Sequence, residues 1–139
     1  MLLADRHHGL RDSVRGLLES EFESVIMVAN ETSLLEGAGL LKPAIVVLDL
    51  SIAEGDVRGL LKRIALQSPD SKVLMLTVHD ERTVAETVLA AGADAVVLKR
   101  SLGTDLVPAV EALRADARYI SPGISPVTGP AANDQAVDP

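Results

Sequence analysis

The sequence predicts a single α/β domain built on a doubly wound parallel sheet. Short apolar runs alternate with helical periodicity from the first residue to about Tyr119, a pattern typical of βαβ units. The apolar runs are nearly continuous rather than alternating with polar residues, which indicates that helices cover both faces of the sheet. With 139 residues, 47% of them hydrophobic, the chain can bury one core of ordinary size.

Five strands are predicted, in the spatial order 2-1-3-4-5 that is common for doubly wound sheets of this size. They are Leu2 to Ala4, Val25 to Ala29, Ile45 to Leu48, Val73 to Leu76 and Ala95 to Leu98. This order places the first strand inside the sheet, next to the point where the winding reverses.

Apolar residues at helical spacing predict a helix after each strand. The stripes are Leu10, Val14, Leu17 and Leu18; Val57, Leu60, Leu61 and Ile64; Val84, Val88 and Leu89; and Leu106, Val110 and Leu113. Asp80 is the predicted N-cap of the fourth helix and Gly92 its end, while Pro108 suits the fifth helix only within its first turn. The second helix, Ser33 to Leu41, contains two glycines that each cost about 1 kcal/mol against Ala. We expect it to be short, frayed or mobile.

The composition changes at Ser121, where the segment SPGISPVTGPAANDQAVDP begins. This segment is rich in Pro, Gly, Ala and polar residues and has no periodicity, as is typical of a linker or disordered tail. We therefore expect one domain over residues 1–120 and a tail over 121–139, which suggests a second domain that is absent from this chain.

Charge and composition exclude several functions. The net charge of −7 argues against nucleic-acid binding by this chain alone, because such binding needs clustered Lys and Arg. The absence of Cys excludes disulfides, thiolate nucleophiles and Cys-containing zinc sites. Asp5 interrupts the apolar N-terminus, so we expect no signal peptide and no membrane span, and a cytoplasmic location.

Polar residues that directly follow the predicted strands are the candidates for a functional site, because ligands of doubly wound sheets bind at the carboxyl ends of the strands. They are Asp5 and Arg6 after the first strand, Asp49 after the third, Thr77 after the fourth and Lys99 after the fifth. Because these strand ends are neighbours in the predicted order, we expect the side chains to converge on one small pocket.

This set of residues suits phosphoryl transfer. Asp49 can act as a nucleophile toward a phosphoryl group and form an acyl phosphate. A Mg²⁺ ion held by Asp5, Asp49 and a backbone carbonyl such as that of Ser51 would neutralise the charges that meet there. Thr77 and Lys99 would contact the phosphoryl oxygens. Taken singly, the residues also have structural interpretations: Asp49 as a capping or solvated acid, Thr77 as a β-branched strand residue, and Lys99 as a surface cation.

The sequence resembles the receiver domain of bacterial two-component response regulators, of the kind that precedes a NarL/FixJ (LuxR-type) helix-turn-helix. The resemblance covers residues 2–122 and rests on LLADRHHGLRDSVRGLL, KPAIVVLDL, SKVLMLTVHDE, AGADAVVLKRS and the closing RYISP. It implies a flavodoxin-like fold. The resemblance matches Asp49 to the phosphoacceptor and Asp5 to an acidic residue of the metal site. It also matches Thr77 to the switch hydroxyl and Lys99 to the lysine that contacts the phosphate.

The resemblance also implies how such a domain works. It implies a sensor histidine kinase as phosphoryl donor, Mg²⁺ as cofactor, and a signalling rather than an enzymatic role. Phosphorylation would control dimerisation or an output domain of DNA-binding type. We expect a homodimer through the fourth and fifth helices or through the first and fifth, since both pairs are amphipathic and flank the sheet edge.

The sequence departs from the family pattern in three places. Arg6 replaces a second acidic residue, Val96 replaces an aromatic residue, and Ile52-Ala53 replaces Met-Pro. Because the metal site loses a negative charge and gains a positive one, Mg²⁺ binding should be weakened or lost. Two interpretations of Arg6 stay open: an exposed surface cation, or an internal counter-ion that occupies the place of the metal beside Asp49. A second hypothesis is therefore a degenerate receiver, in which the chain acts as a dimerisation or protein-binding module without phosphorylation.

Three other site types fit less well. A phosphatase of the haloacid dehalogenase type would need an Asp where this chain has Ser51. A flavodoxin-like FMN carrier would need a phosphate loop and stacking aromatics that are missing. His7, His8 and His79 lack a carboxylate pair at the spacing of a transition-metal site.

Overall fold

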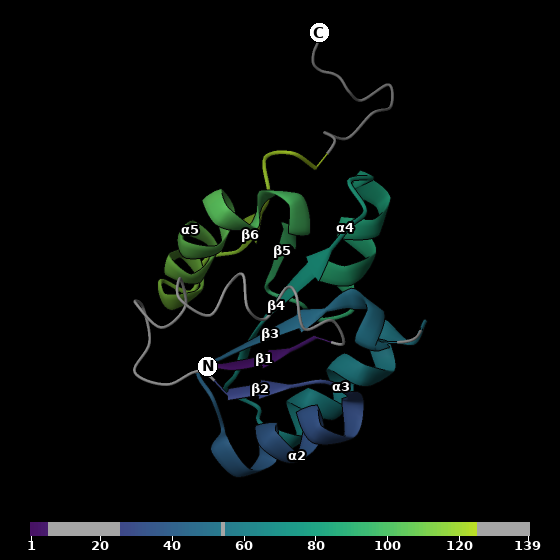
Figure 1. The fold of residues 1–139 in the computed structure, drawn as a ribbon, viewed down its shortest axis with the longest axis vertical. Coiled ribbons are helices and arrows are strands. Elements are labelled where there is room, and N and C mark those ends of the chain that lie inside the picture. Colours follow the sequence, from purple (N-terminus) through teal and green to yellow (C-terminus); the bar gives the residue numbers. More distant parts are fainter. Residues whose placement is uncertain (6–25, 54, 125–139) are drawn as a thin grey trace, which may run out of the picture.

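A computed structural model describes residues 1–5, 26–53 and 55–124. These residues form a six-stranded sheet, parallel throughout, in the order β2-β1-β3-β4-β5-β6, with helices on both faces (Figure 1). The strands are β1 (Leu2–Ala4), β2 (Ile26–Val28), β3 (Ile45–Asp49), β4 (Lys72–Thr77), β5 (Ala95–Leu98) and β6 (Tyr119–Ile120). The helices are α2 (Glu31–Leu41), α3 (Val57–Gln67), α4 (Arg82–Ala90) and α5 (Leu102–Arg114), with short 3-10 helices η1 (Leu50–Ala53) and η2 (Lys99–Ser101). The predicted doubly wound parallel fold is confirmed.

The sheet has one strand more than the five predicted. β6 pairs with β5 through Ala95 with Tyr119 and Val96 with Ile120, and so extends the predicted order by one position. A two-residue strand is too short to give a periodic signal in the sequence, which is why it was not predicted. The predicted first helix, residues 10–18, lies outside the described residues.

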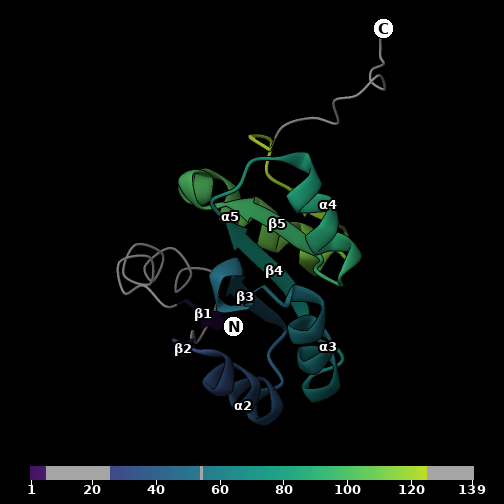
Figure 2. The ribbon, with the colours of Figure 1, turned by 90° about the vertical axis from the view of Figure 1, so that its right-hand side faces the viewer.

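Alternate strand residues face two separate apolar layers, because successive side chains of a strand point to opposite faces. Leu2 and Ala4 belong to the layer under α2, α3 and α4, whereas Leu3 belongs to the layer under α5. Figure 1 shows α5 on one side of the sheet and α3 and α4 on the other, and Figure 2 shows α2, α3 and α4 in front of the strands. Both faces of the central strands are therefore buried, as their continuous apolar sequence predicts.

α2 is longer and better capped than the sequence predicted. Its N-cap Asn30 accepts a hydrogen bond from the Ser33 amide through Oδ1 (2.9 Å), and Lys42 closes the helix in a left-handed conformation. Leu34 and Ala38 are fully buried on its inner face. The expectation of a short helix, begun only at Ser33, was wrong.

The two glycines of α2 explain the error, because both lie where another element approaches closely. A Cβ at Gly37 would lie 3.3 Å from Cδ2 of Leu2, and one at Gly39 would lie 2.7 Å from Oε1 of Gln67. The glycines lower the helix propensity of α2, but they let it pack tightly against β1 and α3.

Two details of the predicted helix ends also differ. Asp80 is not the N-cap of α4: the cap is Glu81, without a side-chain cap bond, and Asp80 instead pairs with Arg100. Pro108 lies in the interior of α5 rather than in its first turn. Gly92 does follow α4 with a positive φ of 124°, as predicted.

The chain stays packed beyond β6. Ser121 and Ile124 are both buried, and Ile124 joins the apolar layer under α2, α3 and α4. Residues 125–139, which make up most of the predicted tail, lie outside the described part. Among the described residues, no helix has the length and apolarity needed to cross a bilayer.

The packing of α2 predicts a contrast between two of its leucines. Leu34 is fully buried and Leu40 is 85% exposed. Leu34→Ala should lower the free energy of unfolding by about 2–5 kcal/mol because it leaves a cavity, whereas Leu40→Ala should change it by less than about 0.5 kcal/mol. Urea unfolding of both variants measures this, and similar losses in both would show that α2 does not pack as described.

Candidate functional site

The carboxyl ends of β3, β4 and β5 surround a small cavity of about 290 Å³. Asp49 is the last residue of β3, Thr77 is the last of β4, and Lys99 directly follows β5. The cavity is lined by Asp49, Leu50, Ser51, Thr77, Val78, His79 and Lys99. Residues far apart in the sequence meet here because parallel strands end at the same edge of the sheet.

The central contact of the site joins Lys99 to Asp49. The Lys99 ammonium donates a hydrogen bond to Oδ2 of Asp49 at 2.6 Å, and the two side chains are 20% and 4% exposed. A charge-assisted hydrogen bond of this length in a mostly buried place is strong. It holds a carboxylate and an ammonium together at the wall of the cavity.

Two further groups hydrogen-bond to the Asp49 carboxyl. The Ser51 amide donates to Oδ1 at 3.2 Å, and the fully buried Asp5 carboxyl shares a hydrogen bond with Asp49. Burial pushes the pKa of Asp49 up, but the hydrogen bonds from Lys99, Asp5 and Ser51, together with the charge of Lys99, outweigh burial and hold this pKa below its usual value. Asp49 is therefore ionised at neutral pH, as a nucleophilic carboxylate must be.

Thr77 presents a hydroxyl at the adjacent strand end. Its side chain is buried, and Oγ1 accepts a hydrogen bond from the His79 amide at 3.0 Å. That contact fixes the position of the oxygen while the hydroxyl proton stays available for a second partner. An anion in the cavity could therefore be met by the Thr77 hydroxyl and the Lys99 ammonium.

The structure thus places Asp5, Asp49, Ser51, Thr77 and Lys99 at one edge of the sheet. Arg6, His7 and His8 lie outside the described residues. Sequence reasoning did not single out the His79 amide or the apolar lining by Leu50 and Val78. A backbone amide gives no sequence signal, because every residue type except Pro carries one.

The oxygen atoms near Asp49 could act as ligands of a hard divalent cation such as Mg²⁺. Two carboxyl groups that share a hydrogen bond need a proton between them, and a cation can take the place of that proton. The nearby η1 turn adds backbone carbonyls such as that of Ser51. Within the described ranges no three His, Asp or Glu side chains gather as a metal cluster, so the ion would keep several water ligands.

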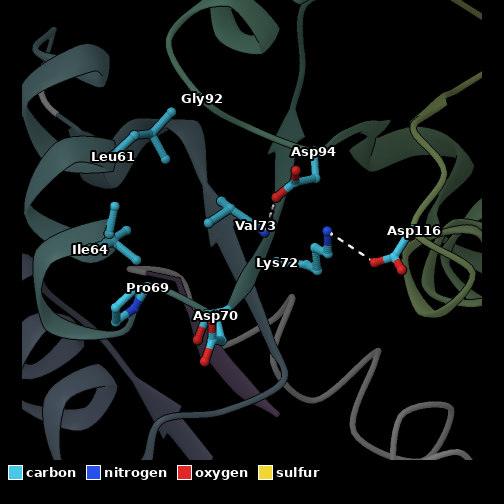
Figure 3. Close-up of a pocket in the computed structure, with 11 residues that line it drawn as sticks. Leu61, Ile64, Pro69, Asp70, Lys72, Val73, Gly92, Asp94 and Asp116 are labelled. Atoms are coloured by element: carbon cyan, nitrogen blue, oxygen red, sulfur yellow. Dashed lines mark hydrogen bonds and ion pairs between the residues drawn. The ribbon is translucent and has the colours of Figure 1, made fainter.

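A larger cavity, of about 460 Å³, lies at the opposite edge of the sheet (Figure 3). Three acids line it, but two of them are already engaged: Asp94 accepts a hydrogen bond from the Val73 amide, and Asp116 pairs with Lys72 at 3.2 Å. The third, Asp70, is exposed. This cavity offers no nucleophile paired with a cation in a buried place, so we assign the chemistry to the smaller one.

Comparison with known proteins gives consistent matches. The profile of the response regulator receiver domain matches residues 1–111. The regulator UvrY of Escherichia coli K12 is 30% identical over 90% of this chain and 58% of its own length, and the regulatory protein DegU of Brevibacillus brevis is 26% identical over 90% and 54%. The chain thus spans about half the length of these curated relatives.

Solved structures give the same result. A LuxR-family two-component response regulator from Aurantimonas sp. SI85-9A1 superposes with a TM-score of 0.78 at 28% identity, covering 88% of this chain and 89% of that one. The non-phosphorylated receiver domain of the stress response regulator RcsB from Escherichia coli gives a TM-score of 0.73 at 27% identity, covering 86% and 95%.

The contacts of Asp49 predict how its titration responds to mutation. Lys99→Ala removes both the hydrogen bond and the positive charge that oppose burial, so the pKa of Asp49 should rise relative to the wild type. Carboxyl ¹³C NMR titration without added metal measures this. Lys72→Ala removes a cation at the opposite edge and should leave the Asp49 titration unchanged. An unchanged Asp49 pKa in Lys99→Ala would contradict the ion pair.

The same shift predicts a pH dependence of stability. Because the pKa of Asp49 is lower in the folded than in the unfolded chain, its contribution is fully present above the unfolded pKa and is lost as the pH falls through the folded pKa. Lys99→Ala should therefore cost more unfolding free energy at neutral pH than at strongly acidic pH. Urea unfolding at both pH values tests the sign, and a cost that grows on acidification would contradict it.

Proposed function

Because the chain belongs to the response regulator receiver domain family, and its relatives are regulators of the NarL/LuxR type, we propose that it accepts a phosphoryl group on Asp49 from a sensor histidine kinase. The observation that supports this most is the ionised, mostly buried Asp49 held by Lys99 at a cavity that Thr77 also lines. The phosphoryl group would control dimerisation or an output domain of DNA-binding type outside this chain.

The proposed phosphoryl transfer uses Asp49 as the nucleophile and the hydrogen-bond donors that line the cavity. A carboxylate oxygen of Asp49 attacks phosphorus and forms a P–O bond, while the P–N bond of the phosphohistidine breaks and its electron pair stays on the imidazole nitrogen. Lys99 exchanges its contact with Oδ2 for one with the incoming phosphoryl oxygens. The Thr77 hydroxyl, already oriented by the His79 amide, donates to another of these oxygens.

Receiver domains generally bind Mg²⁺ at their phosphorylation site. In this chain Asp5, Asp49 and the Ser51 carbonyl would hold the ion, which supplies positive charge against the phosphoryl oxygens. Asp5 suits this role because it is fully buried at the end of β1 and hydrogen-bonds to Asp49.

The partners proposed for this chain follow its family. One solved relative is described as RcsB dimers bound to DNA, and it is 26% identical to this chain with a TM-score of 0.74. We propose a homodimer here as well, through the helix surfaces named from the sequence, of which α4 and α5 lie in the described part. The net charge of −7 leaves DNA contact to a separate output domain.

The proposed function predicts covalent modification of one residue. Incubation with a small phosphodonor and Mg²⁺ should add the mass of one phosphoryl group, and Asp49→Asn should abolish this gain. Lys99→Ala should slow it on the order of 100-fold because a donor to the transferring group is lost. Intact-protein mass spectrometry measures both effects, with Asp70→Asn at the opposite edge as the control. No Asp49-dependent gain under any condition would overturn the proposal.

A second candidate function is a phosphorylation-independent dimerisation or binding module. One observation favours it: among the described residues, Asp5 is the further acid that hydrogen-bonds to Asp49, and no three acidic or His side chains gather there as a metal cluster. In that case Arg6 would take the place of the metal beside Asp49.

This alternative is tested by metal binding. If Arg6 opposes Mg²⁺, Arg6→Asp should tighten Mg²⁺ binding in a calorimetric titration, because it removes a positive charge and adds a hard oxygen ligand. Arg58→Asp makes the same charge change at an exposed position of α3 and is the control. Equal effects of the two variants, or none, would show that Arg6 does not block the site.

A further inference from the structure

A second buried polar cluster lies where the chain leaves the sheet. Ser121 is 1% exposed and Asp105, on α5, is 7% exposed. The Ser121 hydroxyl donates to Oδ2 of Asp105 at 2.7 Å and accepts from the Leu98 amide at 2.9 Å. Asp105 also hydrogen-bonds to Tyr119, and its charge adds to burial in raising the pKa of that phenol. Ser121 and Tyr119 therefore meet at the Asp105 carboxylate of α5, and the Ser121 hydroxyl links this carboxylate to the Leu98 amide at the end of β5.

This cluster completes the hydrogen bonding at the end of β5. β6 pairs only with Ala95 and Val96, so it ends before it can accept from the Leu98 amide. Ser121 continues the ladder in two ways: its amide donates to the Val96 carbonyl at 2.9 Å, and its hydroxyl accepts from Leu98. A buried amide needs such a partner, which explains why a hydroxyl is found here.

The hydrogen bond between Ser121 and Leu98 lies directly beside the candidate site. Leu98 is the last residue of β5, and the next residue is Lys99, whose ammonium binds Asp49. On the other side of β5, Leu98 is aligned with Thr77 of β4. The backbone that carries Lys99 is thus held between the strand that ends in Thr77 and the segment that contains Ser121.

Arg100, which follows Lys99, also contacts the loop after β4 and the segment that contains Ser121. The Arg100 guanidinium donates to Oδ2 of Asp80, in the loop after β4, at 3.3 Å and to the Gly123 carbonyl at 3.4 Å. A Cβ at Gly123 would lie only 3.0 Å from Cδ1 of Leu98, so the segment also packs closely against the end of β5. Arg100 is more exposed than Ser121, and we regard its contact as the weaker of the two.

We propose that Ser121 and Asp105 are positioning residues for Lys99, so that phosphoryl uptake by Asp49 depends on the segment 119–124 being seated against β5. This inference rests on the proposed function for its kinetic effect, but the coupling of Ser121 to Lys99 is independent of phosphorylation. Ser121 fixes the Leu98 amide, the Leu98 backbone fixes the start of η2, and η2 sets where the Lys99 side chain begins its reach to Asp49.

The test is a double-mutant cycle on the rate of Asp49 phosphorylation in the full chain, with a small phosphodonor and Mg²⁺. Ser121→Ala should lower the rate on the order of tenfold, since small misplacements of a reacting group are costly. In a Lys99→Ala background the same change should lower the rate by less than about twofold, because the group that it positions is gone. Equal effects in both backgrounds, or no effect of Ser121→Ala, would overturn the proposal.

Matched variants separate positioning from loss of stability. Ser68→Ala removes another buried hydroxyl, which hydrogen-bonds to Ser71 at the opposite edge, and should leave the rate unchanged. Asp105→Asn keeps an oxygen that can accept from Ser121 and should lower the rate less than Ser121→Ala does. A rate loss in Ser68→Ala equal to that in Ser121→Ala would assign the effect to general destabilisation and overturn the proposal.

A measurement without phosphodonor distinguishes failure of the proposed phosphorylation from failure of the coupling between Ser121 and Lys99. If the wild-type chain takes up no phosphoryl group, the proposed function fails, and the coupling is judged by urea unfolding of Ser121→Ala, Lys99→Ala and the double variant. Losses of unfolding free energy that are not additive would support the positioning role, and additive losses would overturn it.

Discussion

The candidate site depends on one contact, the ion pair between Asp49 and Lys99, which are 50 residues apart in the chain. β4 lies between the strands that carry them, so the contact spans roughly 10 Å of sheet, twice the spacing of neighbouring strands. The register places Asp49 level with Leu76 and Thr77 level with Leu98. Lys99 therefore starts beyond the end of β3 and reaches back across β4, which the long lysine side chain allows.

Burial distinguishes this ion pair from the others in the described part of the chain. The Lys72 to Asp116 pair at the opposite edge has side chains that are 37% and 83% exposed, and pairs of that kind contribute little to stability. Asp49 is almost wholly enclosed, so its charge requires a partner at all times. In the proposed transfer, Lys99 could therefore turn toward a phosphoryl group only once that group is bonded to Asp49 or a cation lies beside Asp49. The proposal thus links Lys99, the Mg²⁺ ion that Asp5 and Asp49 would hold, and Asp49 itself through one electrostatic requirement.

Most of the fold and the placement of the strand-end residues could be predicted from the sequence, because both follow from strong, local signals. Continuous apolar runs identify the central strands, and the polar residue after each run marks the carboxyl edge. The errors arose where tertiary contacts outweigh local signals. Gly37 and Gly39 weaken a helix by propensity but permit its close packing, and Asp80 has the residue type of a helix cap but pairs with Arg100 instead.

The contribution of Ser121 could not be predicted for a related reason. In the sequence it stands at the start of a Pro- and Gly-rich segment, where a serine normally indicates a solvated turn. In the structure it supplies the acceptor that the two-residue β6 lacks, and it is buried against Asp105. A hydroxyl of this kind is specified by where a strand ends relative to its neighbour, and that is a property of the sheet rather than of the local sequence.

If Ser121 positions Lys99, the coupling must act in both directions, because a free energy of interaction between two sites is shared by both. A change of partner at Lys99, from the Asp49 carboxylate to a phosphoryl oxygen, would then alter how firmly Ser121 holds the end of β5. The segment that would respond is the one through which the chain leaves the sheet, at Gly123 and Ile124. Under this proposal, Asp49 and the segment through which the chain leaves the sheet would be coupled through Lys99, and the signal would not need an aromatic residue in place of Val96.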